Sequence, residues 1–172
     1  MSRAERKNVE RPVTYYFRPV VAEDLPFLYQ GLQQPEVRRW WGEPDHELGL
    51  IRGDISSPLI DLKVVLADGQ PVAYIQDYAI SDWPQDHLLH LPDGSRAIDT
   101  FITSESAMGR GHCAGYLRQR AEVLLQRGCP LVVIDPDPEN HRAVRAYQKA
   151  GFTTEHPMSR HSRDALILVF GG

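Results

Sequence analysis

The sequence predicts a single α/β domain in which a mixed central β-sheet of about six to seven strands is flanked by helices. Three observations predict this fold class. At 172 residues the chain has the usual length of one domain and can bury one sizeable core. Short apolar segments alternate with amphipathic helical segments, which is the order typical of α/β proteins. The chain contains no internal repeat.

Composition narrows the classes of protein to consider. No apolar run approaches the ~20 residues that span a bilayer, and a net charge of −4 without a large Lys/Arg cluster argues against a nucleic-acid partner. Cys113 and Cys129 lack metal-ligand spacing. Residues 1–12 are charged, without the apolar stretch of a secretory signal, and should form a flexible arm before a domain of residues 13–172. We therefore expect a cytoplasmic monomer or homodimer that binds neither membrane nor nucleic acid.

The chain opens with a strand followed by helices. Residues 13–18 (VTYYFR) have the β-branched and aromatic composition of a strand. Residues 22–33 follow with the apolar spacing of an amphipathic helix, and residues 35–41 predict a short helical turn. A loop after that turn is indicated by Gly42, Pro44 and Asp45.

A β-hairpin comes next. Residues 62–67 and 71–80 read as strands joined at Asp68-Gly69, and an Asp-Gly pair is a strong signal for a tight turn between antiparallel strands. Alternation along the second strand places on one face Tyr74, Gln76 and Tyr78. Residues 81–95 break the pattern with Pro, Gly, Asp and His. A loop of this length inside a compact domain is a candidate substrate loop.

The second half of the chain reads strand, helix, strand, helix and two final strands. The expected bounds are 96–103, 111–126, 131–134, 139–150, 152–155 and 165–170. The junction between the first strand and helix contains Gly109-Arg110-Gly111. A helix N-terminus presents unpaired N–H groups, and glycines let the backbone approach a phosphate, so this turn predicts an anion site. A tight turn that simply requires glycine is an equal alternative on this segment alone.

A second block makes the interpretation more specific. The segment 135–140 (DPDPEN) follows a short strand, Asn140 begins a helix, Tyr147 lies two turns later, and Ala-Gly-Phe closes it at 150–152. Asn140 and Tyr147 therefore share one helix face. This pattern resembles the last conserved segment of the GNAT acetyltransferases. The resemblance implies the GNAT fold, acetyl-coenzyme A as co-substrate, no metal, and a small-molecule amine as acceptor.

In that family the turn before the first of these helices usually reads R/Q-x-x-G-x-G/A and holds the pyrophosphate of coenzyme A. Residues 108–113 (MGRGHC) resemble it, with Met108 in place of Arg or Gln and Cys113 in place of the second small residue. The resemblance therefore implies coenzyme binding by Phe101, Ile102, Gly109, Arg110, Gly111, His112, Cys113, Ala114 and Asn140.

Within the family the chain is most similar to the aminoglycoside 6′-N-acetyltransferases. The likeness runs from residue 13 to the last strand, and its landmarks are Trp40-Trp41-Gly42, Tyr74, Gln76, Tyr78, Arg96, Ile98, Asp99 and Asp135-Pro136. Residues 82–95 depart from it. An acceptor pocket for a cationic, hydroxylated molecule is expected from Trp40, Trp41, Tyr78, Asp82, Trp83, Asp99 and Asp135. The alternative acceptors are a siderophore precursor or a protein amine, and the alternative class is a non-catalytic acyl-coenzyme A sensor.

Direct transfer needs a base for the amine and an acid for the leaving thiolate. Asp99 lies in an otherwise apolar strand segment, so its carboxylate either faces a pocket or pairs with a cation such as Arg96. By resemblance Asp99 is the base that binds and deprotonates the amine. By resemblance Tyr147 is the acid beside the coenzyme sulfur; its alternative is packing in the core. Asn140 either contacts the pantetheine arm or caps its helix. For Asp135 a turn or cap carboxylate is as good an interpretation as acceptor binding.

Overall fold

The computed structural model describes residues 12–155 and 166–171, whose strands form one mixed sheet. Seven strands of these residues run in the order β1-β2-β3-β4-β5-β7-β6. Their bounds are β1 Tyr15–Pro19, β2 Ile60–Ala67, β3 Gln70–Ala79, β4 Arg96–Ile102, β5 Val132–Ile134, β6 Thr153–Thr154 and β7 Leu168–Phe170. All neighbours pair antiparallel except β4 and β5. The predicted mixed sheet is confirmed. Residues 1–11 of the expected arm and residue 165 of the expected last strand lie outside the described residues.

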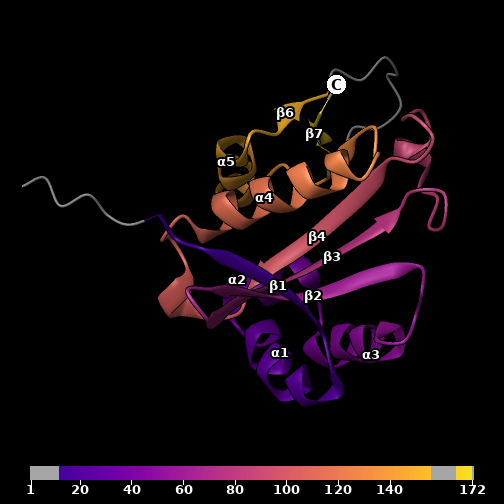
Figure 1. Cartoon of the computed structure of the whole chain (residues 1–172). Coiled ribbons are helices and arrows are strands. Elements are labelled where there is room, and N and C mark those ends of the chain that lie inside the picture. The colour runs from indigo at the N-terminus through magenta and orange to yellow at the C-terminus, as the bar shows by residue number, and fades with distance from the viewer. Residues whose placement is uncertain (1–11, 156–165, 172) are drawn as a thin grey trace, which may run out of the picture.

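Helices cover both faces of the sheet (Figure 1). One face carries α1 Leu25–Leu32, α2 Pro35–Trp41 and α3 Pro44–Asp54, and the other carries α4 His112–Gln126 and α5 His141–Ala150. One expectation is wrong, because Pro44 begins a helix instead of marking a loop. Proline suits the first turn of a helix, where its missing N–H would have no intrahelical partner. No helix of residues 12–155 or 166–171 is long and apolar enough to cross a membrane.

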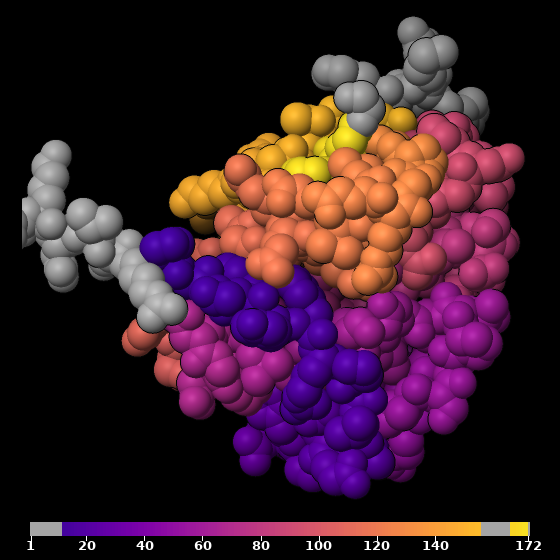
Figure 2. All heavy atoms as spheres, in the orientation of Figure 1, coloured from indigo at the N-terminus to yellow at the C-terminus, as the bar shows by residue number. Residues whose placement is uncertain are grey.

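Buried side chains fill a layer on each side of the sheet. Tyr116 and Leu117 of α4 are fully buried with Ile98 of β4 in one layer, and Leu28 of α1 is fully buried with Tyr74 of β3 in the other. Figure 2 shows the N-terminal strand segment lying against α4. The alternation of β3 and β4 side chains between these two layers follows from the twofold repeat of a strand.

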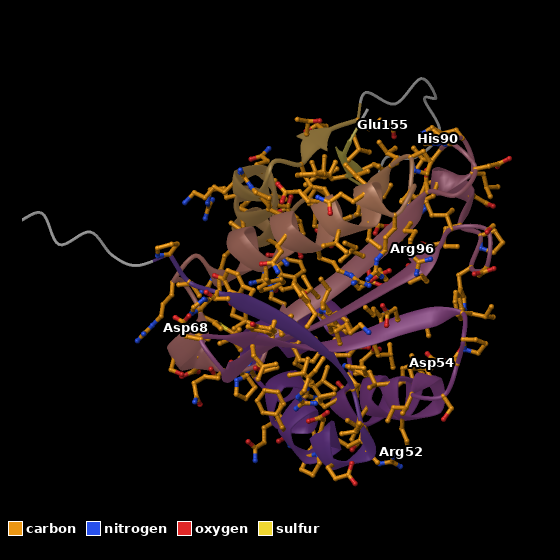
Figure 3. All side chains as sticks on the ribbon, in the orientation of Figure 1. Arg52, Asp54, Asp68, His90, Arg96 and Glu155 are labelled. Carbon is orange, nitrogen blue, oxygen red and sulfur yellow. The ribbon has the colours of Figure 1, made fainter. Side chains whose placement is uncertain are left out.

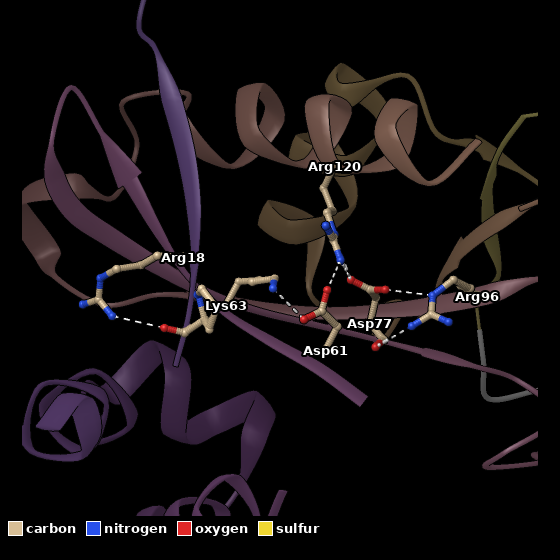
Figure 4. A network of polar contacts seen from close by, with 7 residues as sticks. Arg18, Asp61, Lys63, Asp77, Arg96 and Arg120 are labelled. Carbon is tan, nitrogen blue, oxygen red and sulfur yellow. Dashed lines mark hydrogen bonds and ion pairs between the residues drawn. The ribbon is translucent and has the colours of Figure 1, made fainter. Parts of the chain in front are cut away.

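An ion-pair network joins α4 to the sheet (Figure 4). The buried guanidinium of Arg120 donates through Nε to Asp77 Oδ2 at 2.8 Å and through an Nη atom to Asp61 at 2.6 Å. Arg96 donates from Nε to Asp77 Oδ1 at 2.8 Å. Arg96 is therefore committed to Asp77 on the α4 face, which rules out the alternative that it pairs with Asp99.

The sheet splits between β4 and β5. The two strands pair in parallel only at Arg96 with Val132 and at Ala97 with Val133. Beyond these pairs β4 continues to Ile102, whereas β5 ends at Ile134. Open α/β sheets place ligands at the carboxyl ends of strands where neighbours diverge, so the split marks the position of a site.

Candidate functional site

A cavity of about 300 Å³ lies at the end of β4 that has separated from β5, between this end and the helices α4 and α5. Its walls come from the end of β4, the glycine turn, the first turn of α4, α2 and one face of α5. Eight of the nine residues predicted to bind coenzyme line it, namely Phe101, Ile102, Gly109, Gly111, His112, Cys113, Ala114 and Asn140. The ninth, Arg110, is exposed and does not line the cavity.

The glycine turn is built to expose backbone donors. Gly109 and Gly111 have φ angles of 74° and 80°, in the left-handed region that other residues rarely adopt. Gly111 is the N-cap of α4 and has no side chain to satisfy the first N–H groups of the helix. These donors, together with the positive end of the helix dipole, line the cavity and favour an anionic group there.

Helix α5 adds a basic wall that the sequence analysis did not single out. Arg142, Arg145 and Lys149 line the same cavity. Their spacing of three and four residues puts them on one helix face. Arg142 Nη2 lies 3.7 Å from the position that a Cβ on Gly109 would take, so the guanidinium reaches over the glycine turn. Among the described residues none of the three forms an ion pair. Helix donors and free cations suit a ligand with several phosphates, as coenzyme A has.

Tyr147 and Cys113 meet the cavity from α5 and α4, and both are protonated at neutral pH. Burial raises the pKa of the Tyr147 hydroxyl well above its usual range, and negative charge on Cys113 once it is ionised, and on Asp99 and Asp135, adds to the effect. Burial also raises the pKa of the Cys113 thiol to about 11. A protonated phenol can donate to a ligand in the cavity, whereas a protonated thiol is a poor nucleophile.

Asn140 has the capping role that was its alternative interpretation. Its Oδ1 accepts a hydrogen bond from the Ala143 backbone N at 3.2 Å, at the start of α5. The side chain also lines the cavity, in the same wall as Tyr147. Capping occupies the amide oxygen, and within the described residues the amide nitrogen makes no hydrogen bond. The cap and a contact to a ligand are therefore compatible.

Asp99 lies on β4 directly opposite Gln76 of β3. Its Oδ2 accepts from Gln76 Nε2 at 2.8 Å, and Gln76 Oε1 accepts from the Tyr74 hydroxyl at 2.7 Å. Burial raises the pKa of the Asp99 carboxyl; the Gln76 hydrogen bond opposes this, the charge of Asp135 adds to it, and the resulting value is about 6. A carboxylate with this pKa is ionised at neutral pH yet basic enough to accept a proton.

The residues predicted to hold the acceptor separate into two groups. Trp40 and Trp41 line the 300 Å³ cavity, where Trp41 packs edge-on against Phe101 with ring centroids 4.9 Å apart. The others do not line that cavity. Trp83 packs edge-on against Tyr78 with centroids 5.5 Å apart, and Asp82 is exposed.

Asp135 follows the end of β5 and lies near Asp99. In addition to burial, the charge of Asp135 raises the pKa of the Asp99 carboxyl, and both carboxylates raise the pKa of the Tyr78 hydroxyl, so the two lie near each other and near Tyr78. Ala97 belongs to the same buried cluster as Tyr78, so Asp99, two residues further along β4, emerges on the Tyr78 side. Asp135 Oδ2 lies 2.8 Å from Nε2 of His87, a residue that the sequence analysis did not single out. No group of three or more His, Cys, Asp or Glu side chains in the described parts of the chain could hold a metal ion.

Known proteins resemble this chain in sequence and fold. The family described as Acetyltransferase (GNAT) domain matches residues 20–159. Aminoglycoside N(6')-acetyltransferase type 1 of Klebsiella pneumoniae is 24% identical over 164 residues, covering 88% of this chain and 80% of that protein. A kanamycin resistance protein of Rhizobium radiobacter is 31% identical over 77 residues, covering 44% and 71%. The crystal structure of aminoglycoside acetyltransferase AAC(6')-Ib with coenzyme A and kanamycin shares the fold, with a TM-score of 0.78 at 24% identity over 92% of this chain and 95% of that one.

Proposed function

Because this chain belongs to the GNAT acetyltransferase family, we propose that it transfers acetyl from acetyl-coenzyme A directly to a primary amine of a small polycationic acceptor. Aminoglycosides with a 6′-amine are the leading acceptor class. Relatives named for aminoglycoside N(6')-acetylation and for kanamycin resistance support this choice.

The separation of charge across the split carries the proposal. Helix donors and the cations of α5 surround the cavity, and the carboxylates of Asp99 and Asp135 lie outside its lining, near each other and near the Tyr78 hydroxyl. The cavity extends along β4 to Thr100, the residue next to Asp99. Phosphates held at the α4 N-terminus would therefore leave the thioester end of the coenzyme near the carboxylate that binds the acceptor amine.

Asp99 and Tyr147 divide the proton transfers. Acetyl-coenzyme A supplies an activated acyl group as its thioester. Asp99 accepts a proton from the acceptor ammonium, so the nitrogen lone pair can form a bond to the thioester carbonyl carbon. As the carbon–sulfur bond breaks, Tyr147 donates its hydroxyl proton to the departing thiolate, the new amide nitrogen releases its second proton to water, and Tyr147 regains a proton from water. Cys113 stays a thiol and takes no part, which favours direct transfer over a covalent intermediate.

The remaining sequence-based expectations also stand as proposals. Residues 13–172 form the catalytic domain behind an arm of residues 1–12. The enzyme works in the cytoplasm as a monomer or homodimer. Cys113 and Cys129 are both free thiols, as is usual in a reducing compartment, which supports this location.

Release of free coenzyme A tests the function. The purified protein is given acetyl-coenzyme A and a panel of aminoglycosides, polyamines, siderophore precursors and peptides with free amines, and a thiol reagent records turnover. Turnover on aminoglycosides, with the acetylated product identified by its mass, is the expected result. Turnover only on siderophore precursors or protein amines would replace aminoglycosides as the proposed acceptor class. Coenzyme binding without turnover would favour the alternative of a non-catalytic sensor.

A further inference from the structure

The loop between β3 and β4 is fixed against the proposed acceptor site. Leu88, in the short 3-10 turn Asp86–Leu88, is 1% exposed and belongs to the buried cluster that includes Tyr78. Gln85 Nε2 donates to the Tyr78 hydroxyl at 3.3 Å. These contacts set the position of His87, which lies between Gln85 and Leu88 in the sequence.

The side chain of His87 contacts one of the two neighbouring carboxylates, that of Asp135. Its Nε2 lies 2.8 Å from Asp135 Oδ2, and the two side chains are only 21% and 18% exposed. Asp99, on the same side of the sheet, accepts a hydrogen bond from Gln76 and has no cationic partner among the described residues. The Asp99 carboxylate thus has only a neutral amide partner, whereas the Asp135 carboxylate is in contact with a histidine.

We infer that His87 is a specificity-determining residue that covers Asp135 until a second ammonium group of the acceptor displaces it. This inference rests on the proposed function, since it takes Asp99 as the site of the reacting amine. An ammonium offers Asp135 three N–H donors, whereas the imidazole offers it only the one at Nε2. A monoammonium acceptor bound at Asp99 leaves the His87 contact intact, whereas a diammonium acceptor replaces it. His87 therefore sets the affinity of the second ammonium subsite.

The competing explanation is that the His87–Asp135 contact only fixes the loop in place. The same loop contains a second histidine that serves as a matched control. His90, three residues further on, has its Nε2 2.9 Å from Glu155 Oε2 (Figure 3). This second histidine–carboxylate contact also ties the loop to the neighbouring strands, but it does not involve Asp135. If both histidines only fix the loop, then His87→Phe and His90→Phe should have similar effects. If His87 covers a subsite, only His87→Phe should alter acceptor affinity.

The experiment compares KM and kcat of the wild type, His87→Phe and His90→Phe for a diammonium aminoglycoside and a monoammonium amine. We expect His87→Phe to lower the KM of the diammonium acceptor by about tenfold or more, the range of one hydrogen bond to a charged group. Its kcat and the KM of the monoamine should change less than about twofold. His90→Phe should leave both KM values unchanged. A raised KM for the diammonium acceptor, or equal effects of the two variants, would overturn the inference.

Two further measurements separate this inference from the function on which it rests. Combining His87→Phe with Asp135→Asn should abolish the gain in affinity, since the subsite carboxylate is then absent; a persisting gain would contradict the assignment of Asp135. If the wild type acetylates no amine, the proposed function fails. Calorimetric titration with the same diammonium aminoglycoside, without coenzyme, then tests the role of His87. The His87→Phe variant should still bind the aminoglycoside more tightly than the wild type, and equal Kd values would contradict the inference.

Discussion

Replacing Asp99 with asparagine should remove activity and at the same time stabilise the protein at neutral pH. The amide has nearly the shape of the carboxyl group, and its oxygen can still accept the hydrogen bond that Gln76 donates at 2.8 Å. Only the charge and the ability to take a proton are lost. The variant therefore separates the chemistry of Asp99 from its packing.

The stability effect follows from the raised pKa of Asp99. Its value of about 6 in the folded protein lies above the ordinary 3.8, so the folded state binds this proton more tightly than the unfolded state does. The stabilisation that comes with protonation is fully present below pH 3.8 and is lost as the pH rises through about 6. The difference between the two pKa values corresponds to about 3 kcal/mol, and partial exposure of Asp99 reduces it to about 1–3 kcal/mol. The free energy of unfolding of Asp99→Asn should exceed that of the wild type by this amount at pH 8 and should equal it near pH 4.

Urea unfolding at pH 8 and near pH 4 measures the first effect, and initial rates measure the second. In the wild type, kcat/KM should fall about tenfold per pH unit below pH 6, as the Asp99 carboxylate is protonated. Asp99→Asn should lower kcat by roughly 10² to 10⁴ and leave the Kd of coenzyme A unchanged. A variant that is less stable than the wild type at both pH values would refute the burial argument. Unchanged turnover would remove Asp99 from the mechanism.

Three other predictions concern the cavity and the core. Tyr147→Phe should lower kcat by about 10², with an unchanged Kd for coenzyme A, since only the donor to the thiolate is lost; initial rates and calorimetry check this, and an unchanged kcat would return Tyr147 to a packing role. Arg142→Ala and Arg145→Ala should each raise the Kd of coenzyme A about tenfold and weaken its salt dependence, because each removes a charged contact to phosphate. Calorimetry at two salt concentrations checks this, and a variant with the same Kd as the wild type would contradict it. Asp77→Ala should cost about 3–5 kcal/mol in urea unfolding, because it leaves the buried Arg120 without its main partner; a loss below about 1 kcal/mol would contradict the role assigned to the network.

Local signals in the sequence predicted the hairpin and the coenzyme wall well. Asp68 and Gly69 both adopt positive φ angles, 47° and 83°, as the predicted two-residue turn requires. Asn140 and Tyr147 line one cavity because helix periodicity is fixed, so their spacing alone placed them on one face. These features depend on neighbours in the sequence, and their geometry can be read from spacing.

Helix α3 was missed because its local signals compete. Pro44 begins it, and Gly49 and Gly53 within it lower the intrinsic helix propensity. Ile51 of this helix is buried in the same cluster as residues of α1 and β2, and this tertiary packing outweighs the propensity.

The arrangement of charged groups also depends on contacts that spacing does not show. Asp99 and Asp135 come from neighbouring strands that are far apart in the sequence, and His87 meets Asp135 across 48 positions of the chain. The basic face of α5 gave a different difficulty, since a row of arginines on a helix usually faces solvent. Only the cavity beside Arg142 and Arg145 distinguishes it from a solvated surface.

The central claim is that this acetyltransferase acts on the 6′-amine of an aminoglycoside-like acceptor. The most direct measurement compares two aminoglycosides that differ only in carrying an amine or a hydroxyl at the 6′ carbon, with release of coenzyme A recorded for each. We predict turnover of the amine and none of the hydroxyl compound. Equal turnover of both compounds, or of neither, would contradict the claim.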